Sequence, residues 1–487
     1  MSDVKGNPHL LVISPYFVPR KRVGALRSYK FVKYLNKLDW SLDVVYLDTN
    51  KLHLSDDESH HLSGVHLHAL NVPFDRTTKQ SGSDLSQARD TNVSPEKRLK
   101  PPKKSTSVQT MIDYLERFLP LDTWFPLLRY HYSTVEQVIR KHKPQAIWVT
   151  ADPWSGLVLA SRMAKRSDLP LILDLRDPFT LCPVRSKKKA KWVRYIEHIL
   201  EKSIFEQAVY IVFTARETLE MYQKHYPALK DKMRVIHNAY DATQPRISDV
   251  TSNITSGTEN SGDYRDNPLS KDYFKMVFLG KFRSSSPIDP IITLFERIRE
   301  RHPDVFSDVR LYHIGELEGD ILDRLLHTKM DQHFIPMNAL PYHEVPKMLA
   351  DFEGLVSILN PNRDMVIPSK FWDYLPAQAP IISIGGNSEM ADILTKTGRG
   401  QQFKSNELDL LTMHIYHLWK EWTTKKNQKD VEAPSSHHLS PKQVNNGCNN
   451  PNHPLYLYHA LSKTNELSSL LVEAIEEHNR IPIPSKR

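Results

Sequence analysis

The sequence has few cysteines and no long apolar run. Its only two cysteines, Cys182 and Cys448, lie far apart in different predicted regions. They therefore form neither a disulfide framework nor a metal-type cluster. No apolar run reaches the roughly 18 to 20 residues needed to span a bilayer, and residues 1–6 lack the basic-then-apolar pattern of a secretory signal. These absences predict a cytoplasmic protein that is soluble or peripherally bound to a membrane.

The charge balance is only mildly basic. Lysine and arginine number 65, against 57 aspartates and glutamates, for a formal net charge of +8. This excess permits an anionic partner, such as a nucleotide, a lipid phosphate or nucleic acid, without choosing among them. The apolar fraction of 40% can support buried cores, and 487 residues are too many for one core. Two or more domains are therefore expected.

Short apolar runs alternate with segments of helical periodicity in both halves of the chain. After the first run, for example, Leu26, Tyr29, Val32 and Leu35 recur at helical spacing. Strands that alternate with helices predict parallel, doubly wound sheets. The expected strands are residues 9–14, 42–47, 146–150, 171–175, 209–213, 234–236, 275–279, 309–314, 355–358 and 380–384. The pattern predicts two similar α/β lobes, although two unrelated α/β domains would give the same periodicity.

Polar stretches without an apolar period divide the chain into parts. Their composition is typical of insertions and linkers rather than of packed segments. The last apolar pattern, from residue 455 to about 478, predicts a C-terminal helix. The predicted parts are a first lobe at 1–242 with a polar insertion at 77–107, a linker at 243–272, a second lobe at 273–422, a polar insertion at 423–454, and the C-terminal helix and tail at 455–487.

The most informative segment is Ile-Pro-Ser-Lys-Phe-Trp-Asp-Tyr-Leu at residues 367–375. It places Ser369 and Lys370 where a helix is expected to begin. A helix N-terminus offers unpaired N–H groups and the positive end of the dipole, which suit a phosphate. Lys370 adds a full charge, and Asp373, about one turn further on, would accept hydrogen bonds from a sugar hydroxyl. The alternative is an ordinary capped helix with Ser369 as its N-cap.

A series of short motifs follows in order along the chain. They are residues 11–19 with Gly24 and Arg27, then 39–45, 171–178, 213–215, 235–241, 278–281, 342–346 and 368–375. In this order they resemble the retaining GT-B-fold glycosyltransferases of the family-4 type, particularly bacterial ones that build capsules, lipopolysaccharide and other surface polysaccharides. The resemblance implies an α/β fold with two Rossmann-like lobes and a C-terminal helix that crosses back to the first lobe.

The resemblance also implies the position of the donor site, mainly in the second lobe. Lys281 and Lys370 would stabilise the negative charge that develops on the leaving diphosphate. No Asp-x-Asp motif is placed for a metal, so neither a metal nor a cofactor is expected beside the nucleotide-sugar substrate. The implied donor-binding residues are Gly24, Arg27, Gly280, Arg283, Glu344, Ser369 and Asp373.

Two positions depart from the pattern of the family. Arg176 and Asp177 stand where many relatives have a His-Asp pair, and a guanidinium cannot act as a general base because it stays protonated. As catalytic candidates, Arg176 would position an anionic acceptor or the donor phosphate and Asp177 would orient it; a structural Arg–Asp pair is the alternative. Met365 takes the first acidic position of the E-x7-E motif, beside Asp364, and Asp373 takes the second.

Two further features of the first lobe are an acidic residue that the family shares and a basic segment that could face a membrane. Glu201 matches an acid of the family, with a solvated helix face as the alternative. Residues 185–196 combine a basic cluster with aromatic and apolar side chains, and residues 115–132 add Phe118, Trp124, Phe125, Leu127 and Leu128. Such segments can lie in a bilayer interface. They predict contact with an anionic membrane at the inner face of the plasma membrane, unless the charge run is simply solvated.

The expected function is transfer of a hexose-like sugar from a nucleoside-diphosphate sugar to a polysaccharide or lipid-linked acceptor, without a metal and with retention of configuration. Nucleic acid is not an expected partner. Two alternatives are open. One is a catalytically weakened relative that acts as a binding or assembly subunit, which Met365 and Arg176 favour. The other is a sugar-nucleotide epimerase of the same fold.

Overall fold

A computed structural model describes residues 7–19, 23–48, 53–71, 116–241, 272–282, 286–318, 321–326, 328, 330, 332–340, 344–360, 363–431 and 448–480. The chain divides into two compact units, the first comprising Met1–Asn238 and Ala460–Arg487 and the second Ala239–His459. The predicted insertion at 77–107 and the predicted linker, apart from Asp272, lie outside the described residues. Within the described ranges, no helix is both long and apolar enough to cross a membrane.

The first unit is built on a seven-stranded parallel sheet. Its strands are β1 (His9–Ile13), β2 (Ser41–Asp48), β3 (His66–Asn71), β4 (Ala146–Ala151), β5 (Leu171–Leu175), β6 (Tyr210–Phe213) and β7 (Met233–Val235). They lie in the order β3-β2-β1-β4-β5-β6-β7, and every neighbouring pair is parallel. This order reverses between β1 and β4, as in doubly wound nucleotide-binding folds.

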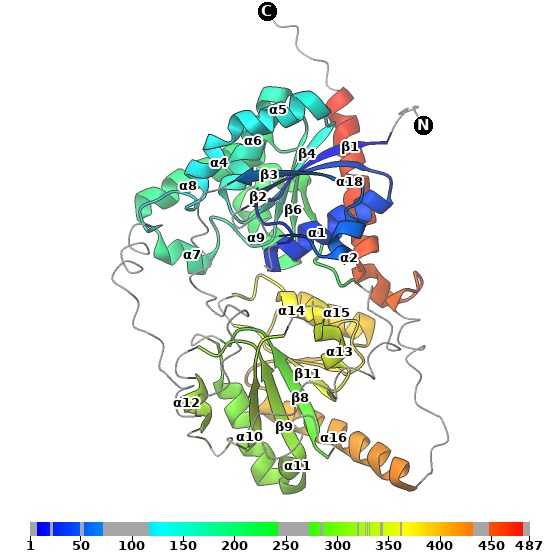
Figure 1. Ribbon diagram of the computed structural model, residues 1–487. Coiled ribbons are helices and arrows are strands. Elements are labelled where there is room, and N and C mark those ends of the chain that lie inside the picture. The colour runs from blue at the N-terminus through cyan, green and yellow to red at the C-terminus, as the bar shows by residue number, and fades with distance from the viewer. Residues whose placement is uncertain are drawn as a thin grey trace, which may run out of the picture. The chain divides into compact units, whose positions relative to one another are not determined.

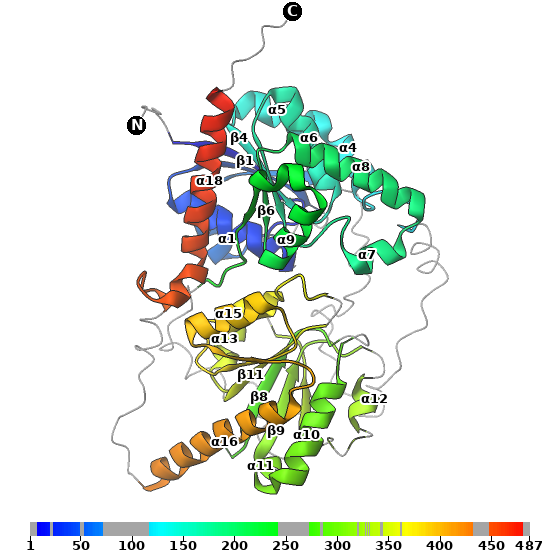
Figure 2. The same ribbon diagram turned by 180° about the vertical axis from the view of Figure 1, so that it is seen from behind.

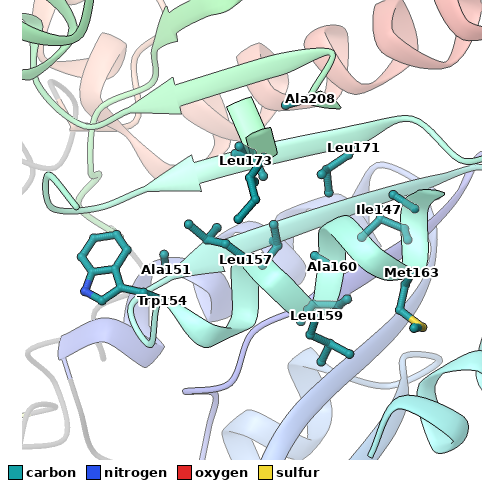
Figure 3. Close-up of a cluster of buried hydrophobic side chains, with 14 of the residues drawn as sticks. Ile147, Ala151, Trp154, Leu157, Leu159, Ala160, Met163, Leu171, Leu173 and Ala208 are labelled. Atoms are coloured by element: carbon teal, nitrogen blue, oxygen red, sulfur yellow. The ribbon is translucent and has the colours of Figure 1, made fainter. Parts of the chain in front are cut away.

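Helices cover both faces of the first sheet. The helices described in this unit are α1 (Val23–Lys37), α2 (Asp56–His61), α4 (Phe125–Tyr130), α5 (Tyr132–His142), α6 (Ser155–Ser167), α7 (Pro183–Lys188), α8 (Lys191–Gln207), α9 (Arg216–His225), α18 (Ala460–Arg480) and the 3-10 helix Pro227–Lys232. On one face, side chains of α6 point toward β4 and β5. Figure 3 shows Leu157 of α6 next to Leu173 of β5. Buried residues of α5, α8 and α9 belong to the same core.

The C-terminal helix α18 completes the other face of this sheet. It lies beside α1 in both views of the ribbon (Figures 1 and 2). Leu467 and Leu471 of α18 are buried in one core with Val12 of β1 and Trp148 of β4. The last described helix of the chain therefore packs in the same core as the first, in keeping with the crossing helix that the resemblance implied.

The second unit repeats the same plan with six parallel strands. These are β8 (Phe274–Leu279), β9 (Val309–Ile314), β10 (Phe334–Met337), β11 (Gly354–Ile358), β12 (Ile381–Ile384) and β13 (Gly400–Phe403). Their order, β10-β9-β8-β11-β12-β13, reverses between β8 and β11. The helices are α10 (Asp289–Arg301), α11 (Pro303–Asp308), α12 (Ile321–Leu326), α13 (Val345–Leu349), α14 (Ser369–Tyr374), α15 (Ser388–Thr397), α16 (Leu408–Val431) and the 3-10 helix Pro454–Tyr458. Residues of α10 and α16 share one core against the sheet.

The structure confirms two Rossmann-like parallel-sheet lobes and differs from the sequence prediction in details. Three strands, β3, β10 and β13, were not predicted. The polar insertion expected at 423–454 does not begin at residue 423, because α16 continues to Val431. Near the end of that segment Cys448 is buried, and its carbonyl oxygen accepts a hydrogen bond of 2.9 Å from the hydroxyl of Tyr240.

Candidate active site

The candidate residues cluster at the reversal points of the two sheets. In open α/β sheets, ligands bind outside the carboxyl ends of the strands, where the strand order reverses. In the first unit, Gly24 follows β1 and Arg176 follows β5, next to β4. In the second unit, Gly280 follows β8 and Lys370 follows β11. Each unit therefore presents a glycine and a cation at the place where this fold holds ligands.

In the second unit, Lys370 passes over the turn at Gly280. Gly280 has φ +103°, and a Cβ placed there would lie 3.4 Å from Cε of Lys370. Gly315 has φ +144°, and a Cβ there would lie 2.3 Å from the carbonyl oxygen of Gly280. Only glycine tolerates that approach. The carbonyl also accepts a 2.8 Å hydrogen bond from Nε2 of His313, whose pKa is lowered by burial. The close approach of Gly315 and the hydrogen bond from His313 thus hold the turn beneath Lys370.

Tyr374 fixes α14, and with it Lys370, against the sheet. Its hydroxyl accepts a 2.8 Å hydrogen bond from the backbone N–H of Leu279 and donates one of 3.2 Å to the carbonyl of Val356. Burial raises the pKa of Tyr374, so the hydroxyl remains a donor. Phe371, on the same helix, is fully buried. By contrast, the Lys370 side chain is 33% exposed, and its Nζ lies 3.9 Å from Oδ2 of Asp373. The helix that carries Lys370 is therefore fixed to the sheet, while the ammonium of Lys370 remains accessible to solvent.

Lys281, which was predicted to stabilise the leaving diphosphate, lies between two glutamates in the structure. Its Nζ lies 2.9 Å from Oε1 of Glu318 and 3.0 Å from Oε2 of Glu316. The pairing follows from a short parallel bridge between Phe282 and Leu317, which brings the two glutamates alongside. Hydrogen bonds to Glu318 and Glu316 raise the pKa of Lys281. Two carboxylates neutralise this ammonium, so a diphosphate would have to displace them.

The remaining donor-site candidates are placed as follows. Ser369 is the first residue of α14, and Pro368 occupies the N-cap position, so the alternative with Ser369 as N-cap is wrong. Asp373 is partly buried on the same helix, and Glu344 is exposed directly before α13. Arg283 lies outside the described residues. The structure thus brings Ser369, Lys370 and Asp373 together on one short helix.

In the first unit, the guanidinium of Arg176 lies against Gly24. A Cβ at Gly24 would lie 1.9 Å from Nη1 of Arg176, so the arginine occupies the space that a side chain would need. Its Nε donates to the carbonyl of Ala151 at 2.7 Å, and its Nη2 donates to Oδ1 of Asp152 at 2.9 Å. Arg176 therefore pairs with Asp152 at the end of β4, and Asp177 is exposed on the adjoining turn. This guanidinium lies beside the first turn of α1, where an anion would be favoured.

Arg27 was predicted to bind the donor, but its guanidinium is hydrogen-bonded within the first unit. It is 6% exposed and forms a bidentate ion pair with Asp174 of β5, Nη2 lying 2.7 Å from Oδ1 and Nε 2.9 Å from Oδ2. The other donors reach the carbonyl oxygens of Ile236 and His237 and Oδ1 of Asn238, at 2.9, 2.8 and 3.1 Å. All five N–H groups are used, so Arg27 holds β5 to the segment after β7 instead of binding a phosphate.

Glu201 is likewise structural, and the solvated helix face weighed for it is wrong. It is 1% exposed and accepts hydrogen bonds of 2.9 Å from the hydroxyls of Tyr222 and Tyr226. It also accepts one of 3.1 Å from the backbone N–H of Thr180. Burial, and then the nearby Glu201, raise the pKa of Tyr222. This carboxylate therefore ties α8 to α9 and to the loop after β5.

The basic segment at 185–196 separates into a structural part and an exposed part. Arg185 forms a bidentate pair with the buried Glu197. Nζ of Lys189 donates to the carbonyl oxygens of Glu116 and Leu119, at 2.8 Å each, and burial lowers its pKa. The exposed basic residues are Lys187, Lys188, Lys191 and Arg194.

An apolar stripe lies on α8, which also carries Lys191 and Arg194; Lys187 and Lys188 lie at the end of α7, just before it in sequence. The stripe recurs at helical spacing and consists of Trp192, Tyr195, Ile196 and Ile199. Tyr195 is 69% and Trp192 52% exposed. Of the side chains predicted at 115–132, Trp124 and Leu128 do not extend this surface, because they are buried in the core of the first unit. We call Lys187, Lys188, Lys191, Arg194 and the stripe the α8 surface.

Comparison with known proteins supports the architecture. Residues 94–244 match the family model Glycosyltransferase Family 4. No curated protein matches this sequence. Sucrose-phosphate synthase from Thermosynechococcus elongatus has a similar structure, with 10% identity, 97% of this chain and 100% of that one covered, and a TM-score of 0.61.

Two other solved structures are similar over nearly their whole length. A glycosyltransferase from Rickettsia africae gives 10% identity, coverage of 96% and 99%, and a TM-score of 0.54. HepE from Anabaena, in complex with UDP and glucose, gives 11% identity, coverage of 96% and 100%, and a TM-score of 0.50. At such low identities the likeness shows the fold alone, and the predicted GT-B fold is confirmed.

Proposed function

We propose that the protein transfers a sugar from a nucleoside-diphosphate sugar to a glycan or lipid-linked acceptor, with retention of configuration and without a catalytic metal or cofactor. The family match in the first unit supports a glycosyltransferase. HepE, which shares the fold, was solved with UDP and glucose, and this supports a nucleotide-sugar donor. Assembly of a surface polysaccharide is the role we propose for the reaction.

The observation that carries this proposal is the position of Lys370 over the Gly280 turn. As the bond between sugar and diphosphate breaks, negative charge accumulates on the leaving phosphate oxygens. A cation that is already fixed near them stabilises this charge without reorganising. Lys370 is held in this way by Tyr374, and Asp373 on the same helix offers an acceptor for a sugar hydroxyl. In the first unit, Arg176 would bind an anionic group of the acceptor or donor.

A binding screen followed by product analysis tests the proposal. A nucleoside-diphosphate sugar that binds should stabilise the purified protein, by about 2.7 kcal/mol at a concentration 100 times its Kd. NMR of the product then gives the anomeric configuration. Binding with epimerisation of the donor alone would favour the epimerase alternative. Binding without turnover would favour a catalytically weakened subunit, for which the neutralised Lys281 is the strongest structural reason. Absence of binding across the panel would contradict the proposal.

We further propose that the α8 surface docks on the anionic inner face of the plasma membrane, where a lipid-linked acceptor would lie. An exposed stripe of aromatic and aliphatic side chains flanked by lysines is typical of helices that lie in a bilayer interface. Trp192 and Tyr195 are suited to the boundary between headgroups and acyl chains, because their rings have both an apolar body and a polar atom. The charges of Lys187, Lys188, Lys191 and Arg194 complement anionic lipid.

Replacing Lys187, Lys188 and Lys191 together with glutamine is expected to weaken binding to anionic vesicles about 100-fold, since each lysine near such a surface contributes about 1 kcal/mol. Lys189 stays unchanged because its ammonium holds backbone carbonyls. Co-sedimentation with phosphatidylglycerol vesicles measures the effect. The matched control replaces three other exposed lysines of the first unit, Lys165, Lys224 and Lys230. Equal binding by the two triple variants would show that the α8 surface is merely solvated.

A further inference from the structure

Four histidines surround one buried carboxylate in the first unit. They lie at the amino ends of the strands, the opposite end of the sheet from Gly24 and Arg176. The carboxylate is that of Asp43, whose side chain is fully buried. We call this group the histidine cluster; its members are Asp43, His9, His66, His68 and His142.

The register of the sheet places these side chains on one face. Asp43 of β2 pairs with Leu11 of β1 and with His66 of β3. Side chains alternate along a strand, so His9, two residues before Leu11, and His68, two residues after His66, share the face of Asp43. His142 is the last residue of α5, which packs on this face of the sheet. Three strands and a helix therefore each contribute to the cluster.

The nitrogen atoms converge on the two oxygens of Asp43. Oδ1 lies 2.6 Å from Nε2 of His68, 3.1 Å from Nδ1 of His142 and 3.6 Å from Nδ1 of His66. Oδ2 lies 2.5 Å from Nε2 of His9. The side chain of His66 is 62% exposed, and those of the other three histidines are between 15% and 22% exposed. Solutes can therefore reach a group whose centre is buried.

The donor set and its spacing suit a transition metal. One ligand atom each from Asp43, His66 and His142 lies within 4.8 Å of the others. Zinc–nitrogen bonds of about 2.0–2.1 Å in a tetrahedral site separate neighbouring ligand atoms by about 3.3 Å. The distances of 3.1 and 3.6 Å from Oδ1 to His142 and His66 bracket this value. Imidazole favours zinc and its neighbours in the first transition row, whereas calcium and magnesium prefer oxygen ligands alone.

We propose that the histidine cluster binds one divalent transition-metal ion, zinc being the first candidate, through Asp43, His66 and His142. His68 or a water molecule takes the fourth position. His9, bound to the second oxygen of Asp43, holds the carboxylate in place, as partners beyond the ligands do in metal sites. The ion joins the amino ends of β2 and β3 to the end of α5. Its role is structural and independent of the proposed sugar transfer.

The test uses the chain of residues 1–487 after removal of metal with a chelator. Titration with zinc is expected to show one tight equivalent and to raise the thermal midpoint. Cobalt in its place is expected to give the strong visible absorption of a tetrahedral site. His142→Gln and His66→Gln should each weaken zinc affinity by at least about 10-fold. Even the loss of a residue that only holds a ligand in place typically weakens metal affinity by about 10- to 100-fold.

A matched control separates this site from adventitious binding by histidine. His60 is an exposed histidine of α2 in the same unit, and His60→Gln should leave affinity and stoichiometry unchanged. His66 is largely exposed, so its variant is expected to fold, which circular dichroism checks. Weak zinc binding that all three variants share would overturn the proposal. So would an unchanged thermal midpoint of the wild-type protein with zinc, since the cluster would then be only a hydrogen-bonded network around Asp43.

Discussion

Lys370→Ala is expected to lower turnover of the nucleotide-sugar donor by about 100- to 1000-fold, the loss typical of removing one preorganised group that stabilises transition-state charge. The physical reason is the position of the ammonium over the Gly280 turn, which Tyr374 fixes. Folding should change little, because the Lys370 side chain is 33% exposed and its ion-pair contact with Asp373 is long, at 3.9 Å. Steady-state kinetics and thermal unfolding of the purified variant measure both effects.

Lys396→Ala is the matched control for this experiment. Lys396 is an exposed lysine in the last turn of α15, in the same unit. Its loss removes the same charge from the surface and should leave turnover unchanged. If the two variants were equally active, the chemistry would not depend on the Gly280 turn. Turnover that vanishes with EDTA while the thermal midpoint stays unchanged, and that returns with added metal, would contradict the metal-free mechanism.

Arg27→Ala is expected to lower the free energy of unfolding of the first unit by about 3–5 kcal/mol, the cost of breaking a buried ion pair by removing one partner. The substitution leaves the carboxylate of Asp174 buried without its bidentate partner. It also removes the hydrogen bonds to the carbonyls of Ile236 and His237. Urea denaturation followed by circular dichroism gives the change.

An exposed arginine provides the contrast. Arg140 pairs with Glu136 on α5, and its side chain is 74% exposed, so Arg140→Ala should cost at most about 1 kcal/mol. Combining Arg27→Ala with Asp174→Ala should be less destabilising than the sum of the single changes, because the unpaired charge is gone. An Arg27→Ala variant as stable as Arg140→Ala would refute the structural role assigned to Arg27.

The central strands of both sheets could be predicted from the sequence, and the missed strands share a physical cause. Every expected apolar run is a strand, because strands buried on both faces consist of consecutive apolar residues. The missed strands β3, β10 and β13 all lie at an edge of their sheet. An edge strand is less buried and needs fewer apolar residues; β3 carries His66 and His68, and β13 carries Gln401 and Gln402.

The candidate site was predictable where it depends on neighbours in sequence and not where it depends on distant partners. Lys370 and Asp373 share one helix, as their spacing indicated. The partner of Arg27 is 147 residues away, and no local pattern indicates that Asp174 would use up its guanidinium. The same holds for Asp43 and His142, which only the fold brings together. The alternation His-Leu-His at 66–68 was the one local signal of that cluster.

The division of the first unit into two separate pieces of chain constrains how the protein can fold during synthesis. Helix α18 leaves the ribosome about 220 residues after Asn238, with Ala239–His459 in between. At translation rates of about 5–20 residues per second, that delay is about 10 to 45 s. Throughout this time the apolar surface of β1 and β4 that Leu467 and Leu471 will cover has no cover from α18. The second unit, continuous in sequence, can form first, so the nascent first unit is the part that would need a chaperone.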